Sequence, residues 1–464
     1  MDGSADRREK PCRNELSRIQ VSAGSTSANC FTLWETVPHS MPTRAQAPSA
    51  VPRLTYLRIK NYRALRDVEF RDLTPLTVLI GPNGSGKSTV LDALDFLAEA
   101  VRGNLVGAWE NEKRNRFAGL RTRGIDDPVE LELALNSTVV GNTLHYLLVI
   151  DEVDERVIVI KEELVEKDES GEQIASFIVN NIQPRNARFK VIDRESANNL
   201  TSNHPLGLGV GTAIDGYSSA TSESKVAFFA DIESPIKKQA TYFLRIISSY
   251  RYIHLTDDHL KGFSDAGPRE KLSPNGDNLP NVLYYLHTKH PEALAKITAQ
   301  MRRWVPGLAD IVTERTSDER LLLRFKDAPF EKPLPAQYMS DGTMRLAALL
   351  TLLYEPDAAG LLGIEEPENE LHPQLLAYLA EELIAAAETR QLLVASHSPA
   401  LLNALEPEQV WILHRDAMGY TQATRTADLP GISAMVAEGS PLGYLWSRNF
   451  FDVGNPLDLP APIQ

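Results

Sequence analysis

Four acidic residues lie within six positions in the stretch LLGIEEPENELHP, residues 361–373. Glu365 and Glu366 come first, directly after an apolar run that is typical of a strand buried on both faces. Adjacent carboxylates at a strand end suit reactions of a bound phosphate, in which one acid holds Mg²⁺ and the other orients a water molecule. We therefore assign Glu365 to the metal and Glu366 to the water. The alternative is that both acids simply precede a helix, as we expect for Glu368 and Glu370.

A glycine-rich loop far upstream supplies a phosphate-binding partner for these acids. The stretch GPNGSGKST fits the pattern G-x-x-x-x-G-K-[ST], in which the fixed positions are Gly81, Gly86, Lys87 and Ser88. Backbone N–H groups of such a loop surround an anion, the lysine reaches the outer phosphates and the hydroxyl binds Mg²⁺. The sequence thus predicts a nucleotide site formed by Gly81, Pro82, Asn83, Gly84, Ser85, Gly86, Lys87, Ser88 and Thr89. The competing interpretation is a glycine-rich turn that happens to contain a lysine.

Strands and a helix are predicted where this loop needs them. Residues 76–80 are apolar apart from Thr77, which is typical of a buried strand, and Leu91, Leu94 and Leu97 recur at helical spacing after the loop. Alternating apolar residues between Leu54 and Phe70 predict two further strands joined by a turn. A strand before the loop and a helix after it are the context that makes the glycine pattern specific.

Two later segments carry further candidates. Ser340 and Gly342 stand in SDGT at the start of a strongly apolar helix, where free N–H groups can meet an anion. His397 follows the apolar run 392–395 and can reach the edge of a bound phosphate. The alternatives are a helix N-cap at Ser340 or Asp341 and a capping histidine in a strand-to-helix turn. The order of the four motifs along the chain favours one shared site.

These motifs, in this order, resemble the ABC-type ATPase head shared by SMC proteins, RecF and OLD-family enzymes, and above all the bacterial RecF-like AAA-type ATPases. The matching segments are NYRAL, GPNGSGKST, SDGTMRLAALL, IEEPENELHP and SHSPALL. The resemblance implies an α/β P-loop NTPase fold with a mostly parallel central sheet. It also implies ATP and Mg²⁺ as cofactors, hydrolysis of ATP to ADP and phosphate, and a homodimer that forms with ATP.

Further site roles follow from the same resemblance. Ser340 and Gly342 are expected to contact the γ-phosphate of ATP held by a second protomer, and residues 369–372 to form a loop across the dimer seam. His397 is the expected switch histidine. The usual Q-loop glutamine is absent, because no glutamine occurs between residues 51 and 172.

The motifs divide the chain into five parts. Residues 51–135 and 328–430 are predicted to form the two halves of the ATPase head. Residues 136–327 are predicted to form an inserted α+β lobe in place of a coiled coil, because strand-like and helical runs occur there without sustained heptads. We expect residues 1–50 to be a disordered leader or an over-called start, with Met41 as the initiator, and residues 431–464 to be a C-terminal tail. The part after Trp411 is too short for an appended nuclease domain, so nuclease activity is not expected.

The overall composition of the chain excludes several classes of protein. A chain of 464 residues with 43% hydrophobic residues can bury more than one core. No apolar run reaches the ~18 residues that a membrane span needs, so no membrane partner is expected. The two cysteines, Cys12 and Cys30, provide no disulfide framework for the rest of the chain, which favours a cytoplasmic protein. The formal net charge of −14 argues against a uniformly basic surface that coats nucleic acid.

Local basic clusters nevertheless occur. One comprises Lys113, Arg114, Arg116, Arg121 and Arg123, and the other comprises Arg185, Arg188 and Lys190 around Phe189. Such clusters can bind the phosphodiester backbone, or they are ordinary solvated loops. Two functions therefore remain open. One is an ATP-switched dimer that acts on DNA in repair, such as double-strand break repair, in recombination or in genome defence; the other is a signalling or scaffold ATPase that binds an effector protein.

Overall fold

The computed structural model describes residues 51–455, except residues 103–104, 111–118, 137–141, 154–155, 184–185, 194–213, 219–235, 263 and 266. In the strands between residues 179 and 218 it describes the backbone alone. The leader expected over residues 1–50 lies outside this part of the chain. Over the described residues, no helix has both the length and the apolar character needed to cross a membrane.

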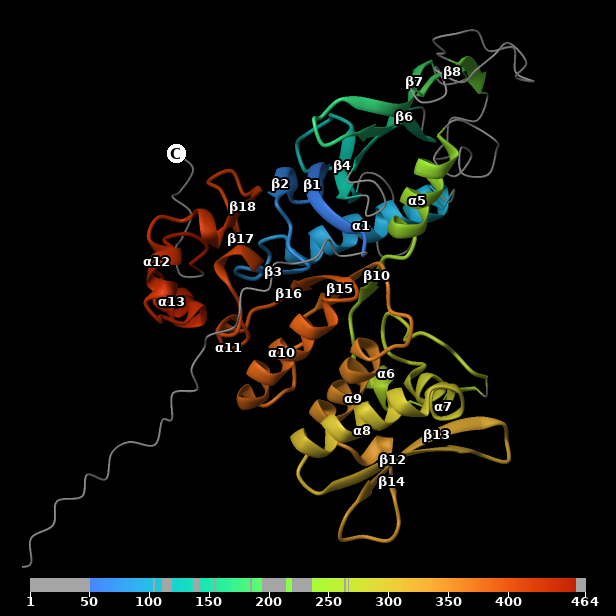
Figure 1. Cartoon of the computed structure of the whole chain (residues 1–464), viewed down its shortest axis with the longest axis vertical. Helices are drawn as coiled ribbons and strands as arrows, with labels where there is room; N and C mark the ends of the chain where they lie inside the picture. The colour runs from blue at the N-terminus through green and yellow to red at the C-terminus, as the bar shows by residue number, and fades with distance from the viewer. Residues whose placement is uncertain are drawn as a thin grey trace, which may run out of the picture. The chain divides into compact units, whose positions relative to one another are not determined.

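A six-stranded sheet forms the centre of the head, in the order β10-β15-β16-β3-β17-β18 (Figure 1). The strands are β3 (Leu76–Ile80), β10 (Arg251–Ile253), β15 (Leu361–Glu365), β16 (Gln391–Ala395), β17 (Val410–Arg415) and β18 (Thr421–Arg425). Every pair from β10 to β17 is parallel, and β18 is antiparallel to β17. All residues of β3 and β16 are buried, as strands covered on both faces require. The predicted α/β fold with a mostly parallel central sheet is confirmed.

Side chains of the central strands alternate between two hydrophobic cores. Leu79 of β3 belongs to the core that contains α1 (Lys87–Val101), α2 (Leu105–Glu110) and α5 (Lys237–Ile247). Val78 and Ile80 belong to the opposite core, which contains α7 (Leu279–Lys289), α8 (Pro291–Trp304), α9 (Asp341–Leu353), α10 (Leu376–Ala386) and α11 (Pro399–Leu402). Helices therefore cover both faces of the sheet, as in other doubly wound folds.

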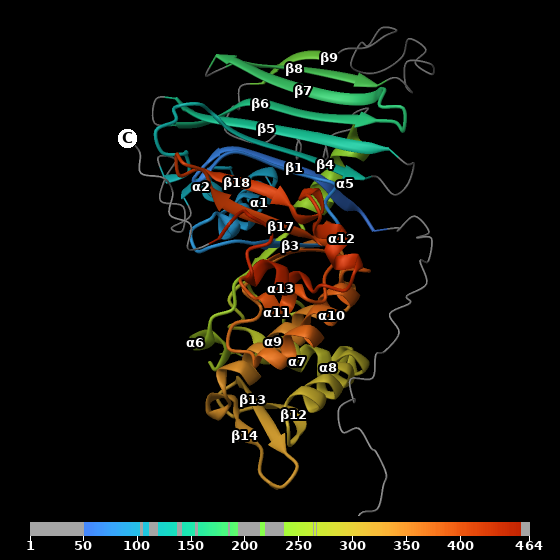
Figure 2. The same ribbon diagram turned by 90° about the vertical axis from the view of Figure 1, so that its left-hand side faces the viewer.

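An eight-stranded antiparallel sheet packs beside α1 in the order β2-β1-β4-β5-β6-β7-β8-β9 (Figure 2). Its strands are β1 (Arg53–Tyr62), β2 (Leu65–Arg71), β4 (Val129–Asn136), β5 (Thr143–Val153), β6 (Arg156–Lys167), β7 (Gln173–Gln183), β8 (Asn186–Asp193) and β9 (Ile214–Ser218). The two strands predicted between Leu54 and Phe70 are β1 and β2, joined as an antiparallel pair. Residues from both the first ATPase segment and the expected insert thus share one sheet.

A smaller sheet lies at the other end of the expected insert. It contains β11 (Ser264–Asp265), β12 (Leu308–Arg315), β13 (Arg320–Asp327) and β14 (Leu334–Pro335), with the short helix α6 (Asp257–Leu260) before it. Short 3-10 turns cover Ala336–Tyr338, Pro373–Leu375, Pro407–Gln409 and Thr426–Asp428.

Two boundaries differ from the expected ones. Residues 136–327 do not form one lobe, because β5 to β9 extend the sheet of β1 and β2 while β10 joins the central sheet beside β15. The expected tail is also part of the head as far as it is described. It contains α12 (Ile432–Ala437) and α13 (Leu442–Ser447), and their apolar residues Ile432, Leu442 and Leu445 are buried in the core around α9. Burial of these apolar side chains is what holds both helices against the head.

Candidate phosphate and metal site

The glycine loop follows β3 and is tight because neighbouring strands leave no room for side chains. Gly81 has a φ of 145°, and a Cβ there would lie 2.0 Å from the carbonyl oxygen of Leu413. Gly86 has a φ of 104°, and a Cβ there would lie 2.6 Å from the Thr421 hydroxyl. Gly86 caps α1 without a side-chain hydrogen bond. The first N–H groups of the helix are therefore available to an anion.

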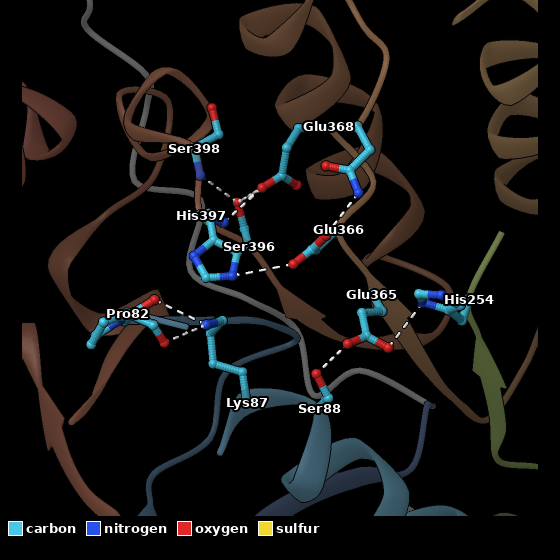
Figure 3. A network of polar contacts seen from close by, with 12 residues as sticks. Pro82, Lys87, Ser88, His254, Glu365, Glu366, Glu368, Ser396, His397 and Ser398 are labelled. Carbon is cyan, nitrogen blue, oxygen red and sulfur yellow. Dashed lines mark hydrogen bonds and ion pairs between the residues drawn. The ribbon is translucent and has the colours of Figure 1, made fainter. Parts of the chain in front are cut away.

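Lys87 is buried at the start of α1 and bonds to the loop itself. Its Nζ donates to the carbonyl oxygens of Gly81 at 2.9 Å and of Pro82 at 3.1 Å (Figure 3). Burial lowers the pKa of Lys87 to about 8, although the carboxylates of Glu366 and Glu365 favour the charged form. An incoming phosphate would have to replace the two carbonyl oxygens as the acceptors of this ammonium group.

Glu365 ends β15 and is held by three neighbouring side chains. Ser88 donates a hydrogen bond to one carboxylate oxygen, Tyr252 donates to the other, and His254 Nδ1 lies 3.0 Å from that second oxygen. Burial by itself raises the pKa of Glu365, but these three contacts outweigh it and lower the pKa to about 2. Glu365 is consequently a carboxylate at neutral pH.

The residues around Ser88 fit a magnesium ion. Mg²⁺ takes oxygen ligands and is commonly held by one or two carboxylates together with the phosphates of its nucleotide. The Ser88 hydroxyl and the Glu365 carboxylate are in direct contact beside the first turn of α1. Across the described residues, no group of three or more His, Cys, Asp or Glu side chains could hold a metal by itself. The donor set therefore suits a metal that arrives with a phosphate.

Glu366 adopts a left-handed backbone conformation, with a φ of 43°, directly after β15. Its N–H donates to the carbonyl oxygen of Ala395 at 2.8 Å, which fixes this turn against the end of β16. One carboxylate oxygen lies 3.2 Å from His397 Nε2, and the other accepts from Asn369 Nδ2 at 2.7 Å. Burial and the charge of Lys87 lower the pKa of His397, so the imidazole is neutral at pH 7.

We expected Glu368 to be a carboxylate that simply precedes a helix, but the structure gives it a different role. It accepts hydrogen bonds from the Ser396 hydroxyl at 2.7 Å and from the backbone N–H of His397 at 2.6 Å. Figure 3 shows its carboxylate directed at the turn that follows β16. Glu368 thus fixes the backbone that carries His397. Glu370 is exposed.

The SDGT segment begins α9 and forms a helix N-cap. The Ser340 hydroxyl accepts from the N–H of Thr343 at 3.2 Å. A Cβ at Gly342 would lie 2.3 Å from the carbonyl oxygen of Glu370, so this glycine packs directly on the loop after β15. Among the described residues, no hydrogen bond or ion pair joins Ser340 or Gly342 to the glycine loop. The structure brings together the other predicted site residues and leaves these two apart from them.

The strand that carries the acids, β15, is not the direct neighbour of β3, which leads into the glycine loop. β16, which ends before His397, lies between β15 and β3. Glu365 is paired in register with Ala395 of β16. The contact between Ser88 and Glu365 therefore crosses the end of β16, where the parallel strands share one carboxyl edge.

A cleft of about 650 Å³ is lined by four arginines, Arg63, Arg121, Arg123 and Arg415. Arg415 Nε donates to the carbonyl oxygen of Gly84 at 2.7 Å, which joins the cleft to the loop. Arg121 forms an ion pair with Asp151. The other members of the predicted basic cluster, Lys113, Arg114 and Arg116, lie outside the described residues, and so do the side chains of Arg185, Arg188, Phe189 and Lys190.

Two functional neighbours of Glu365 were not found from the sequence. Tyr252 and His254 come from β10 and the residue after its end, within the segment expected to form a separate lobe. Their alternation in RYIHL places both side chains on the same side of the strand. That alternation was the available signal, but it covers too few residues to identify a strand of the central sheet.

Comparison with known proteins gives one extended match and several short ones. The family described as "AAA domain, putative AbiEii toxin, Type IV TA system" matches residues 76–403. An OLD nuclease of Thermus scotoductus is 48% identical over 44 residues, which is 10% of this chain and 8% of the relative. The DNA replication and repair protein RecF of Chlorobium luteolum is 40% identical over 60 residues, 13% of this chain and 16% of the relative.

A third relative and two solved structures complete the comparison. Structural maintenance of chromosomes protein 1 of Arabidopsis thaliana is 29% identical over 133 residues, 25% of this chain and 10% of the relative. The chain thus spans at most 16% of these curated relatives. An SMC head bound to the C-winged helix domain of ScpA has a TM-score of 0.46 at 14% identity, covering 80% of this chain and 97% of its own. The SMC head domain from Thermotoga maritima has a TM-score of 0.36 at 13% identity, covering 80% and 98%.

The extended match carries the assignment. It begins at the first residue of β3 and ends just after α11, so it includes the glycine loop, both acids after β15 and His397. The short matches to OLD, RecF and SMC proteins agree with it. The chain therefore belongs to this AAA-domain family and is an ABC-type P-loop ATPase of the RecF, SMC and OLD class.

Proposed function

We propose that the protein binds ATP with Mg²⁺ and hydrolyses it to ADP and phosphate, as a homodimer that closes when ATP is bound. The observation that carries the proposal is the meeting of the glycine loop with Glu365 and Glu366 at one edge of the central sheet. These groups come from segments far apart in the sequence, so chance clustering is a poor explanation for them.

The first part of the proposal concerns phosphate binding. The open N–H groups of α1 and the ammonium group of Lys87 receive the phosphates, and Lys87 exchanges its bonds to Gly81 and Pro82 for bonds to phosphate oxygens. The arginine-lined cleft next to Gly84 would receive the nucleoside end. Its guanidinium groups can stack on a base and pair with the inner phosphate.

The second part concerns hydrolysis. Ser88 and Glu365 would hold Mg²⁺, which neutralises charge on the phosphates when it is bound. Glu366 orients the attacking water and accepts its proton. Its carboxylate is kept in place by Asn369 and by His397, and the neutral imidazole of His397 can donate a hydrogen bond to the carboxylate or to a phosphate oxygen.

The third part concerns the dimer. Ser340 is exposed. Its hydroxyl bonds to Thr343, and within the described residues no hydrogen bond joins Ser340 to the glycine loop of the same chain. We infer that Ser340 and Gly342 complete the site of a second protomer. An isologous dimer would then contain two such shared sites.

Glu366→Gln tests this function, with Glu381→Gln, at an exposed position of α10, as the matched control. Because Glu366 acts on water and not on binding, its amide variant should keep the affinity for MgATP and lose at least ~100-fold in turnover, the range expected for removal of a general base. The Glu381 variant should retain full turnover. Normal turnover in Glu366→Gln would overturn the assigned role, and the same loss in Glu365→Gln alone would exchange the roles of the two acids.

Complementation tests the shared site. Lys87→Ala chains cannot bind phosphate and Ser340→Arg chains cannot complete a partner's site, so each variant alone should be inactive. Mixed, they should regain one intact composite site per heterodimer. No gain of ATPase activity on mixing would refute sites shared between protomers.

We further propose that the closed dimer binds DNA, on the basis of the exposed face of α5. Lys237, Lys238 and Arg245 lie on one side of this helix around a shallow cleft of about 380 Å³, together with Thr241 and Tyr242. No acidic residue occurs in α5. Such a face can replace counterions on phosphodiester groups without reading base sequence.

Salt dependence distinguishes DNA binding from binding of an effector protein. Changing Lys237, Lys238 and Arg245 to Ala should reduce the slope of log K against log salt for duplex DNA by about 3, close to one per phosphate contact. Changing the exposed Lys289 and Lys296 should leave the slope unaltered. Fluorescence anisotropy with Glu366→Gln and ATP measures this. Absence of duplex binding at low salt would favour the scaffold function with a protein effector.

A further inference from the structure

The segment after β10 contacts both the candidate metal carboxylate and the start of α9. We call residues 254–261, which include helix α6 itself, the β10–α6 linker. Its first residue, His254, lies against Glu365, and its last residue, Lys261, lies against Asp341. The chain has no glutamine in the part where the resembling ATPases carry their Q-loop. The linker thus touches both places, in addition to the loop after β15.

The first contact is fixed by strand register. β10 pairs in parallel with β15 through Arg251↔Leu362, Tyr252↔Gly363 and Ile253↔Ile364. Continuing this register places His254 beside Glu365, where its Nδ1 lies 3.0 Å from the carboxylate. The N–H of His254 donates to the carbonyl oxygen of Pro274 at 2.8 Å, so the backbone here is held on its other side as well.

The middle of the linker is tied to the helix that follows the SDGT segment. Arg345 of α9 is 4% exposed and donates from Nη2 to the carbonyl oxygen of Leu255 at 3.0 Å. Its Nη1 contacts the carbonyl oxygen of Glu366 at 3.4 Å. Leu255 and Leu260 are buried in the core that contains α9. A shift of the linker would therefore be transmitted to α9 through a packed interface.

The last contact is an ion pair at the N-terminus of α9. Lys261 Nζ lies 2.5 Å from Asp341 Oδ1, next to Ser340, and both side chains are partly exposed. Exposed ion pairs of this kind contribute little to folding stability. A pair that is dispensable for folding but adjacent to the residue proposed to contact a second protomer is suited to setting the orientation of that residue.

We propose that the β10–α6 linker couples the metal carboxylate to the dimer-forming end of α9 within one protomer, with His254 and Lys261 as positioning residues at its two ends. This inference rests on the proposed ATP-dependent dimer. Glu365 changes partners when phosphate and Mg²⁺ reach Ser88, His254 follows the carboxylate, and the linker carries that movement through Leu255 and Lys261 to Ser340. The linker would thus serve where the missing glutamine otherwise would.

Dimerisation provides the test, measured by sedimentation velocity in the Glu366→Gln background with and without ATP. Lys261→Ala should bind a fluorescent ATP analogue with unchanged affinity per chain but require at least tenfold more protein to dimerise with ATP. The exchange of both charges, Lys261→Asp with Asp341→Lys, should restore dimerisation to within about threefold of the Glu366→Gln parent, because it rebuilds the ion pair. Lys271→Ala, at an exposed lysine of the same region, is the control and should behave as the parent.

His254 is tested at the other end of the linker. His254→Ala should raise the Mg²⁺ concentration needed for ATP-driven dimerisation at least fivefold, and His254→Asn, which keeps a donor near the position of Nδ1, should reverse most of this. If the His254 and Lys261 variants dimerise like the parent, the proposed coupling is wrong but the proposed dimer still stands. The same conclusion holds if the charge exchange does not restore dimerisation. A parent that fails to dimerise with ATP would overturn the proposed dimer and the coupling together.

Discussion

Glu368 offers a sharp test of the site because its carboxylate supports a turn and does not react. One oxygen accepts from the Ser396 hydroxyl at 2.7 Å and from the N–H of His397 at 2.6 Å. Ser396 is fully buried, so its hydroxyl cannot turn to bulk water once the carboxylate is removed. The same hydroxyl accepts from the N–H of Ser398 at 3.0 Å. Removal of one carboxylate therefore disturbs the whole turn after β16.

The magnitude follows from these bonds. Glu368→Ala removes two hydrogen bonds to an ionised group, each of which contributes about 1.5–3 kcal/mol. Because both bonds end on one oxygen, their contributions overlap, and we expect the free energy of unfolding to fall by about 3–4 kcal/mol. Glu368→Gln keeps an uncharged acceptor oxygen and should lose about 1–2 kcal/mol. Glu370→Ala, two positions later and exposed, should change it by less than about 0.5 kcal/mol.

Unfolding in guanidinium chloride, followed by tryptophan fluorescence, measures these differences, and hydrogen exchange of the His397 amide locates them. Glu368→Ala should also slow ATP hydrolysis, because the backbone that carries His397 is no longer fixed. Equal denaturation midpoints for Glu368→Ala and Glu370→Ala, with equal protection of the His397 amide, would refute the structural role given to Glu368.

Three further outcomes are expected. Lys87→Ala should weaken MgATP binding at least ~100-fold in calorimetry, since charge-assisted bonds to phosphate are lost; retained affinity would contradict the phosphate site. Gly342→Ala should impair ATP-driven dimerisation in sedimentation but not binding per chain, because a Cβ would lie 2.3 Å from the Glu370 carbonyl oxygen. Hydrolysis should fall as the pH drops below the ordinary histidine pKa of 6.5, because the neutral His397 gains a proton. His397→Gln should lack this acidic limb in steady-state assays.

The central sheet was predictable because its strands carry a strong local signal. Apart from Thr77, the runs 76–80 and 392–395 are apolar, and both lie in fully buried strands. The glycine loop was predictable for a different reason. Gly81 and Gly86 occupy positive φ and lie against Leu413 and Thr421, so the backbone there tolerates few other residues.

Contacts between distant segments were not predictable in the same way. β10 has three residues, and a strand that short shows neither an apolar period nor clear boundaries. Its place beside β15 depends on pairing across more than a hundred residues of chain. Glu368 looked like one of several acids before a helix, and only the fold shows that it accepts from Ser396 and His397. The sequence shows that such residues are polar, but it does not show which groups they bond to in the fold.

The charged groups of the site are already paired within the chain, and this shapes how ATP must act on it. Lys87 bonds to two carbonyl oxygens, Glu365 to Ser88 and Tyr252, and Glu366 to Asn369. MgATP must exchange these partners for its own, so the net gain on binding is smaller than the new contacts alone suggest. The exposed Ser340 can contact a phosphate of a second protomer while its hydroxyl still accepts from the N–H of Thr343, so this contact needs no such exchange. Binding of ATP and pairing of protomers would then reinforce each other, and the apparent affinity for ATP should rise with the concentration of the chain.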